Sequence, residues 1–356
     1  MKIAILIFVV LLTGVCFAQE KRPEPREFTV SNAAELAEAV KEMPWTGGRI
    51  RLGPGEYRVA DTLYFRGTCF LTIEGAGAST VIRKEGPGDL MQFEGNCWHD
   101  TIRDLTLEGD PAAEVSSGIV FVPDGKGDHC GSVTIRDCRI MGFAQSGVRF
   151  EGSPSKPQSS NVISGCLFQN NKSHQLYMKA SNDFHIVQNQ FGASPGVLPL
   201  SGCFLDGCSA GTYSMNYHWD NVKGLIAGAG SNYNRIENNR FEESAACGLQ
   251  IGDSGGEASY NIIIGNTIHT NSKNNYGAYN QVEAMNANNT TFTGNQIFSW
   301  NHMTTASRNS LFLSDTCKEW IIKDNIFRHF TERAIVYDKN GKHIIKDNIT
   351  GESVER

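Results

Sequence analysis

Short apolar segments, separated by polar residues and glycine, recur through most of the chain with a constant internal spacing. In each copy one bend position, most often asparagine, lies three residues after an apolar side chain. In all copies but the last, it also lies two residues before another. The bend positions are Leu105, Cys138, Cys166, Asn189, Asn239, Asn266, Asn295, Asn325 and Asn348. A unit that returns about every 20 to 30 residues predicts a solenoid.

The content of each unit favours strands over helices. The apolar segments are short and rich in β-branched residues, and no unit contains an amphipathic helix, which excludes leucine-rich, ankyrin and tetratricopeptide repeats. Asparagine tolerates the left-handed backbone of a sharp bend, and asparagines stacked in successive coils can hydrogen-bond to one another. We therefore expect an all-β fold, a single-stranded parallel β-helix of roughly ten coils, counted from the recurring unit. In it, Asn239, Asn266, Asn295 and Asn325 form one inward-facing row.

A second strand follows the bend in each unit, as in GVRF from Gly147 and GLQI from Gly248. Side chains alternate across a strand, and neighbouring coils lie about 4.8 Å apart, so the outward residues form a continuous row. This predicted row contains Val120, Arg149, Tyr177, Ile226, Gln250, Glu283, Phe312 and Val336. Cys203–Asp206 is one more such strand, with Phe204 and Asp206 outside. The path of residues 192–224 stays open between an extra coil and one long loop.

The N-terminal part of the chain differs from the repeats. NAAELAEAVKEM predicts a helix that starts near Asn32, where Asn32 and Glu35 match a capping box, and an amphipathic helix can cover the open end of a solenoid. We divide the chain into a signal peptide, residues 1–18, and a flexible lead, residues 19–30. The β-helix domain with its capping helix then spans residues 31–350, and residues 351–356 form a tail.

After this helix come GGRIRLGPGEY and LTIEGAGASTVI. These two stretches closely resemble the start of secreted proteins of the pectate-lyase-like superfamily, and the rungs that follow resemble the same superfamily over about residues 28–350. The resemblance implies a right-handed parallel β-helix. It implies little about chemistry, because that fold hosts lyases, hydrolases, epimerases, esterases and non-enzymatic proteins. The catalytic motifs of polygalacturonases and of the best-known pectate lyases are absent, so no catalytic residue is carried over.

The first residues indicate export. Lys2 precedes the apolar run Ile3–Val15, and Cys16-Phe17-Ala18 follows as a small-x-small cleavage site. We expect a signal peptide cleaved near Ala18 and a periplasmic or extracellular protein. The formal net charge is -6 and no basic run occurs, which excludes nucleic acid as a partner. No other stretch is apolar enough to span a membrane, and we expect a monomer.

The centre of the outward row is its most charged part, which favours a sugar polymer as the partner. Elimination in a uronic-acid polymer needs a cation on the carboxylate, a base for the C5 proton and an acid for the leaving oxygen. We assign Arg149 to the carboxylate, Lys179 or Tyr177 to the base, and His174 or His218 to the acid or an alternative base. The predicted substrate-binding residues are Asp206, His218, Trp219, Gln250 and Glu283, with the segment Tyr213–Asp220 as a wall of the groove.

We therefore expect a polysaccharide lyase or an epimerase, and two alternatives stay open. A glycoside hydrolase needs two carboxylates, for which Asp206 with Asp253 or Glu283 are the candidates. A non-catalytic carbohydrate-binding or structural β-helix needs no reactive group. No metal-ligand spacing of cysteine or histidine occurs, and no metal is assigned. Calcium is the one candidate cofactor, with Glu283 and Asp253 as its candidate ligands.

Overall fold

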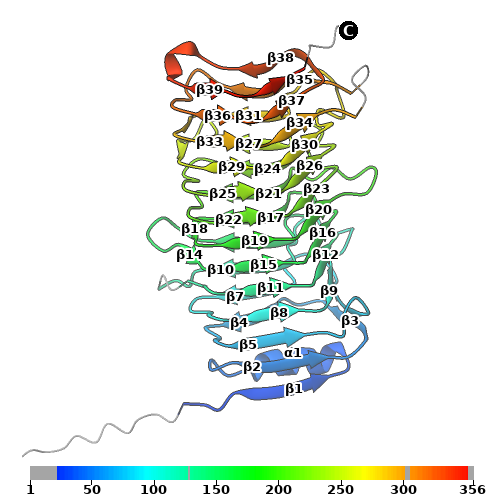
Figure 1. Cartoon of the computed structure of the whole chain (residues 1–356). Helices are drawn as coiled ribbons and strands as arrows, with labels where there is room; N and C mark the ends of the chain where they lie inside the picture. Colours follow the sequence, from blue (N-terminus) through cyan, green and yellow to red (C-terminus); the bar gives the residue numbers. More distant parts are fainter. Residues whose placement is uncertain (1–21, 127–128, 301–304, 352–356) are drawn as a thin grey trace, which may run out of the picture.

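The structure is a computed structural model that describes residues 22–126, 129–300 and 305–351. The chain winds into a column of stacked coils in which strands from successive coils lie side by side (Figure 1). Three sheets of 13, 12 and 11 strands run along the column. Neighbouring strands in these sheets are parallel. The predicted signal peptide, residues 1–18, lies outside the described residues.

The 13-stranded sheet contains the first strand of each unit. Its inward side chains are mainly isoleucines, such as Ile102, Ile135 and Ile163, and these are fully buried. In spatial order its strands are β1 (Arg26–Val30), β2 (Gly48–Leu52), β5 (Leu71–Glu74), β8 (Thr101–Arg103), β11 (Thr134–Arg136), β15 (Val162–Ser164), β19 (His185–Val187), β22 (Thr212–Ser214), β25 (Arg235–Glu237), β29 (Ile262–Ile264), β33 (Thr291–Thr293), β36 (Ile321–Lys323) and β39 (Ile344–Lys346).

The 12-stranded sheet follows each bend. Phe168, Phe191 and Phe241 are buried members of its inward face. Its strands are β3 (Gly55–Val59), β6 (Thr80–Lys84), β9 (Thr106–Glu108), β12 (Arg139–Met141), β16 (Leu167–Gln169), β20 (Gln190–Gly192), β23 (Tyr217–His218), β26 (Arg240–Glu242), β30 (Thr267–His269), β34 (Gln296–Phe298), β37 (Ile326–Phe327) and β40 (Ile349–Thr350).

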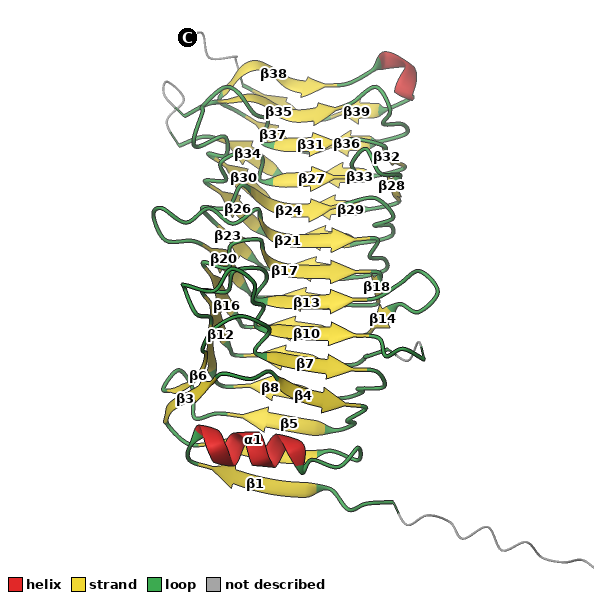
Figure 2. Cartoon of the chain, turned by 180° about the vertical axis from the view of Figure 1, so that it is seen from behind, coloured by secondary structure: helices red, strands yellow, loops and turns green. Residues whose placement is uncertain are grey.

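The 11-stranded sheet closes each coil and faces the viewer in Figure 2. Phe65, Phe93, Phe121 and Phe150 stack along its inward face with ring centroids 4.5 to 4.9 Å apart. Its strands are β4 (Leu63–Arg66), β7 (Met91–Glu94), β10 (Ile119–Val122), β13 (Val148–Glu151), β17 (His174–Lys179), β21 (Ser201–Asp206), β24 (Lys223–Ala227), β27 (Leu249–Ile251), β31 (Val282–Ala284), β35 (Ser307–Leu313) and β38 (Phe330–Val336).

Four short strands and one helical turn complete the connections. The strands β14 (Gln158–Ser159) and β18 (Ser181–Asn182) pair with each other, as do β28 (Ala258–Ser259) and β32 (Ala287–Asn288). The 3-10 helix η1 (Lys339–Gly341) precedes β39. The prediction of an all-β parallel solenoid is therefore confirmed.

The expected helix forms as α1 (Ala33–Lys41) and packs beside β1 at the N-terminal end of the column (Figure 2). The N–H of Glu35 donates to Oδ1 of Asn32 at 2.9 Å, which is the predicted N-cap. Leu36 and Val40 are buried beneath the helix. The helix is where the apolar periodicity placed it, whereas its role as a cap for the solenoid stays a prediction.

The solenoid begins earlier than the sequence indicated. Arg26–Val30, which we expected in a flexible lead, forms β1 and pairs with β2 in parallel over five residue pairs. The boundary at residue 31 is therefore wrong. The segment alternates with Phe28 half-buried and Val30 buried, and a short strand in register with β2 satisfies its backbone groups.

The predicted row of asparagines is confirmed and extends further than expected. Each amide nitrogen donates to the amide oxygen of the next asparagine, with distances of 2.9 to 3.1 Å. The row runs through Asn189, Asn216, Asn239, Asn266, Asn295, Asn325 and Asn348. Towards the N-terminus Cys166 continues it, because its backbone N–H donates to Oδ1 of Asn189 at 2.9 Å.

Asn216 resolves the path that the sequence left open. Residues 192–224 form an additional coil, with β21 in the 11-stranded sheet, β22 before the bend and β23 after it. This coil places Tyr213 and His218 on the inward side, where both are fully buried. The segment Tyr213–Asp220 is therefore not a long loop over the 11-stranded sheet, and its predicted role as a groove wall is wrong.

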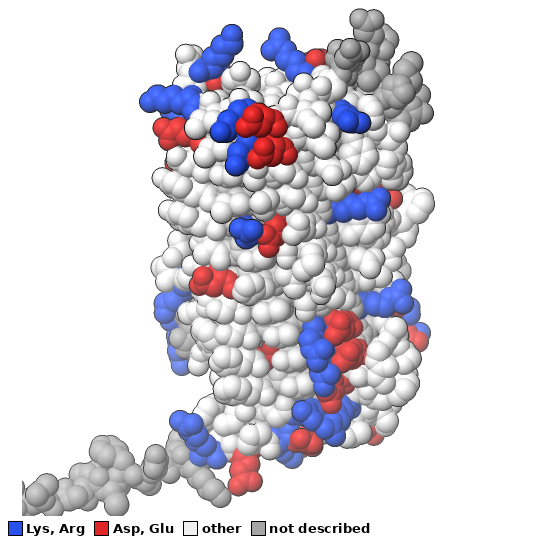
Figure 3. Space-filling model, viewed as in Figure 1, with Lys and Arg blue, Asp and Glu red and all other residues white. Residues whose placement is uncertain are grey.

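The described part of the chain contains no disulfide, and its cysteines, Cys69 to Cys317, are free thiols. Charged side chains on the face seen in Figure 3 occur as isolated residues or small groups of both signs, separated by uncharged surface. Among the described residues, no helix is long and apolar enough to cross a membrane.

Candidate functional site

The outward row of the 11-stranded sheet, which we call the stripe, has the register that the sequence predicted. Phe204 takes its place between Tyr177 and Ile226 because β21 supplies the extra coil. The side chain of Val120 is covered, so the accessible part of the stripe begins at Arg149. In order, the stripe contains Val120, Arg149, Tyr177, Phe204, Ile226, Gln250, Glu283, Phe312 and Val336.

The centre of the stripe contains a compact group of polar and aromatic side chains. The hydroxyl of Tyr177 donates to Oδ2 of Asp206 at 2.7 Å, and Nδ1 of His174 lies 2.8 Å from Oγ of Ser201. The imidazole of His174 stacks on the ring of Tyr177 with centroids 5.7 Å apart and meets the edge of Phe204 at 5.2 Å. These contacts fix the orientation of the imidazole.

Burial sets the protonation states in this group. Desolvation lowers the pKa of His174 to about 4, against an opposing contribution from the Asp206 carboxylate, so the imidazole is neutral near pH 7. Desolvation and the hydrogen bond to Asp206 raise the pKa of Tyr177 well above its ordinary value. Tyr177 therefore stays a phenol, which disfavours the predicted role of Tyr177 as a base. His174 is a neutral proton acceptor.

Two cations lie beside this group, and their surroundings differ. Lys179 is exposed, lies in register with Glu151 and Asp206, and makes no side-chain hydrogen bond or ion pair with another described residue. Arg149 is held by carboxylates instead: its Nε lies 3.4 Å from Oε1 of Glu151, and its Nη2 lies 3.9 Å from Oδ2 of Asp89. Lys179 is thus the cation better placed to meet an incoming anionic group.

Further along the stripe, a pocket of about 320 Å³ opens over β24, β27 and β31. Lys223 donates to the side-chain oxygen of Gln250, and Nδ2 of Asn280 donates to Oε1 of Glu283 at 2.9 Å. Asp253 also lines the pocket. The predicted residues Gln250 and Glu283 therefore share one concave surface, on the same face of the sheet as Tyr177, Lys179 and Asp206.

Two predicted substrate-binding residues lie elsewhere. His218 faces the interior between Phe191 and Phe241, with ring centroids 4.8 Å from each, and its Nε2 lies 2.5 Å from the hydroxyl of Tyr213. It cannot contact a polymer at the surface, so its predicted role is wrong. Trp219 follows β23 and lies on the outward side of the 12-stranded sheet, not over the stripe.

The sequence did not single out Ser201, Lys223 or Asn280. The first two lie in register with His174 at the start of their strands, because β17 and β24 begin one position earlier, and β21 two positions earlier, than the apolar pattern indicates. The alignment of His174 with Ser201 and Lys223 could not be predicted from the sequence, because it depends on the additional coil that contains β21. Within the described residues no group of three or more His, Cys, Asp and Glu side chains is arranged to hold a metal ion. Calcium at Asp253 and Glu283 stays a prediction.

The stacked coils and the three parallel sheets define a right-handed parallel β-helix protein. The family described as "Right handed beta helix region" matches residues 117–267 and 201–354, and the chain belongs to this family. No protein with a curated description matches the chain in sequence.

Solved structures with the same fold have low sequence identity. The A-module of mannuronan C-5 epimerase AlgE6 from Azotobacter vinelandii matches with a TM-score of 0.66 and 17% identity, over 90% of this chain and 94% of that chain. DFA-IIIase from Arthrobacter chlorophenolicus A6 matches with a TM-score of 0.63 and 13% identity, over 92% and 94%. Tailspike protein 2 of bacteriophage CBA120 matches with a TM-score of 0.66 and 14% identity, over 82% of this chain but 44% of that chain. These similarities establish the fold.

Proposed function

We propose that the protein acts on a uronic-acid polysaccharide by removing the proton from C5 of a sugar residue in the stripe. The single observation that carries the proposal is the neutral imidazole of His174, oriented by Ser201 and Tyr177 on the outward face of β17, the strand that also carries Lys179. Proton abstraction beside a carboxylate needs an unprotonated base and a cation for the carboxylate, and β17 carries a candidate for each.

The shape of the stripe also fits a polymer. Successive coils are about 4.8 Å apart, so an extended chain of sugars can contact several coils in turn, from Tyr177 to Glu283. Support for the substrate class comes from the AlgE6 module, whose name is that of a mannuronan C-5 epimerase. Identity to it is 17%, so the similarity does not identify catalytic residues in this chain.

The proposed step begins with the carboxylate of a uronate paired to the Lys179 ammonium. Pairing stabilises the negative charge that develops on this group when the C5–H bond breaks. His174 accepts the proton, and the carboxylate of Asp206 favours the imidazolium that forms. Tyr177, held by Asp206, keeps the imidazole in place and is a positioning residue in this scheme.

The carbanion has two outcomes. In β-elimination the electron pair forms the C4–C5 double bond, the C4–O bond breaks, and the imidazolium returns its proton to the leaving oxygen. In epimerisation C5 takes a proton on the opposite face, and no bond of the chain breaks. We favour elimination, because one base that also returns the proton suffices for it, whereas epimerisation needs a second proton donor across the sugar.

Incubation with a panel of uronic-acid polysaccharides tests the proposal. Elimination creates an unsaturated product with new ultraviolet absorbance, and epimerisation in heavy water exchanges the C5 proton for deuterium. The appearance of reducing ends without either change would instead favour hydrolysis by the carboxylates of the pocket, Asp253 and Glu283.

The pH dependence of turnover should report the environment of His174. Because desolvation lowers its pKa to about 4, from an ordinary value of 6.5, the base stays neutral and active well below pH 6.5. We expect kcat/KM to be flat between about pH 5 and 7 and to fall about tenfold per pH unit below about 4. An acidic limb near pH 6.5 would contradict the assignment.

Replacing Lys179 with alanine should raise KM by about tenfold or more and also lower kcat, because the ammonium contacts the carboxylate both before and during proton removal. Arg149→Ala should have a smaller effect, since Glu151 and Asp89 already hold its guanidinium. Steady-state kinetics would measure both. Val336→Ala, at the far end of the stripe, and Lys41→Ala, on α1, are the controls and should leave kcat and KM unchanged. Equal kinetics for Lys179→Ala and Lys41→Ala would refute the role of Lys179.

A further inference from the structure

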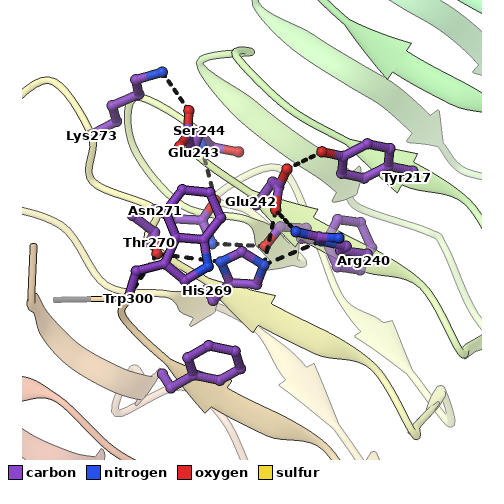
Figure 4. A network of polar contacts seen from close by, with 12 residues as sticks. Tyr217, Arg240, Glu242, Glu243, Ser244, His269, Thr270, Asn271, Lys273 and Trp300 are labelled. Atoms are coloured by element: carbon purple, nitrogen blue, oxygen red, sulfur yellow. Dashed lines mark hydrogen bonds and ion pairs between the residues drawn. The ribbon is translucent and has the colours of Figure 1, made fainter.

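A second group of aromatic and charged side chains lies on the outward side of the 12-stranded sheet, away from the stripe. We call it the aromatic cluster. It contains Tyr217, Trp219, Arg240, Glu242, His269 and Trp300. Figure 4 shows Tyr217, Arg240 and Glu242 next to His269 and Trp300 in one connected network. These residues come from β23, β26 and β30 and from the segments directly after β23 and β34.

The centre of the cluster is the nearly buried carboxylate of Glu242, whose side chain is 6% exposed. The hydroxyl of Tyr217 donates to its Oε1, and its Oε2 contacts Nη2 of Arg240 at 2.5 Å and Nε2 of His269 at 2.9 Å. Burial alone raises the pKa of Glu242, but its contacts with His269 and Tyr217 lower this pKa below its ordinary value. An ionised Glu242 therefore holds Arg240 in one position.

Arg240 lies at the surface although its partner is buried. Its side chain is 49% exposed, and its guanidinium lies over the ring of Tyr217, 5.1 Å from the centroid. Trp300 is 56% exposed, and its indole contacts His269 with centroids 5.1 Å apart. A fixed guanidinium beside exposed ring faces can donate hydrogen bonds to a ligand while the rings contact its apolar face.

Trp219 is a second aromatic side chain next to Tyr217, and its flat indole lies against the sheet. A Cβ on Gly192 would lie 1.9 Å from Cε2 of Trp219, so the indole occupies the space directly over this glycine. One face of the ring packs on the sheet, and Tyr217 adjoins it with centroids 4.9 Å apart. The Trp219 side chain is partly exposed, which leaves part of the indole accessible to a ligand.

The charges around the aromatic cluster indicate which class of ligand it can bind. The cluster balances Arg240 against Glu242, and the adjoining pocket of about 440 Å³ places Lys273 between Asp220 at 2.7 Å and Glu243 at 2.5 Å. The cations are thus already paired, which does not favour an anionic ligand. Hydroxyl groups, which both donate and accept hydrogen bonds, match paired charges better.

We propose that the aromatic cluster is a second carbohydrate-binding surface that binds pyranose rings of a neutral glycan. The C–H face of a ring stacks on Trp219 or Trp300, and Arg240 donates to ring hydroxyls. No bond is made or broken here, so the surface holds a polymer independently of proton removal in the stripe.

Affinity electrophoresis in gels containing a neutral polysaccharide tests this surface. The probes are hydroxyethylcellulose, galactomannan, xyloglucan and dextran, with alginate as the acidic comparison. We expect at least one neutral probe to retard the full chain, and Trp219→Ala and Arg240→Ala each to weaken that retardation about tenfold. Trp45→Ala removes a tryptophan that is 50% exposed at another site and should leave retardation unchanged.

A second variant distinguishes the loss of the binding surface from misfolding of the protein. Gly192→Ala keeps every cluster residue but lifts the indole of Trp219, and it should weaken retardation as Trp219→Ala does, while circular dichroism and the thermal midpoint report the fold. Retardation by none of the neutral probes, or equal retardation of wild type and Trp219→Ala, would overturn the proposal. His174→Ala should be retarded like wild type, so failure of this surface and failure of the proposed reaction are distinguishable.

Discussion

His174→Ala is expected to lower turnover of a uronate polysaccharide by on the order of 10²-fold or more, with KM nearly unchanged. The imidazole is the neutral base in the centre of the stripe, and its loss removes proton transfer from the transition state without removing the cation at Lys179 that binds the carboxylate. Steady-state kinetics on the polymer identified by the panel would measure both parameters.

Two comparisons make this result specific. His185 is exposed on β19, in the 13-stranded sheet, and His185→Ala should have wild-type kinetics. Added imidazole should restore part of the activity of His174→Ala, because a small base can enter the space that the side chain vacates. Wild-type turnover in His174→Ala would exclude His174 as the base.

Asn239→Ala is expected to lower the free energy of unfolding by about 3 kcal/mol or more. Oδ1 of Asn239 accepts from the backbone N–H and Nδ2 of Asn216 at 2.9 and 3.1 Å, and its Nδ2 donates to the carbonyl of Tyr213 and to Oδ1 of Asn266, each at 3.0 Å. Truncation leaves several of these buried groups without partners, and water cannot replace the amide in the interior. Urea denaturation followed by circular dichroism would measure the loss.

Asn348→Ala is the matched control. Asn348 ends the same row, where it accepts from Asn325 at 2.9 Å but is partly exposed, so water can satisfy the groups that its truncation frees. We expect its effect to be less than half that of Asn239→Ala. Equal losses for the two variants, or a loss below about 0.5 kcal/mol for Asn239→Ala, would show that the row contributes little to stability.

The repeat made the architecture predictable, because one position per coil has a strict structural requirement. Asn266 and Asn295 occupy bends where neighbouring amides must bond, and Ile263 and Ile268 flank the first of these at fixed distances in sequence and face the core. Alternation then fixed the register of the second strand. The stripe from Arg149 to Glu283 therefore followed from the sequence.

The spacing of inward residues around each bend asparagine also predicts that His218 faces the core. This copy of the repeat was missed because its inward residues are polar. Asn216 has Tyr213 three residues before it and His218 two residues after it, in the positions where other coils have isoleucine and phenylalanine. A search for apolar residues passes over this copy. In the structure His218 and Tyr213 contact each other inside the core, so a mutually bonded polar pair replaces an apolar one.

The chemistry of the candidate site depended on contacts that the sequence pattern does not encode. Lys179 and Arg149 are both cations on neighbouring coils. Only the structure shows that Lys179 has no ion-pair partner among the described residues, whereas the carboxylates of Glu151 and Asp89 lie beside Arg149. In the same way, the burial of His174 and the bond between Tyr177 and Asp206 determine which side chain can accept a proton. The aromatic cluster requires four coils and Gly192 to come together and has no local motif.

The central claim is that the stripe removes the C5 proton of a uronate residue. Proton nuclear magnetic resonance of the polymer, recorded after incubation in heavy water, tests it most directly, because both elimination and epimerisation remove the C5 proton signal. We expect that signal to disappear from at least one polymer of the panel with the wild-type protein and to persist with His174→Ala. Persistence of the C5 proton in every polymer with the wild-type protein, or its equal loss with His174→Ala, would contradict the account.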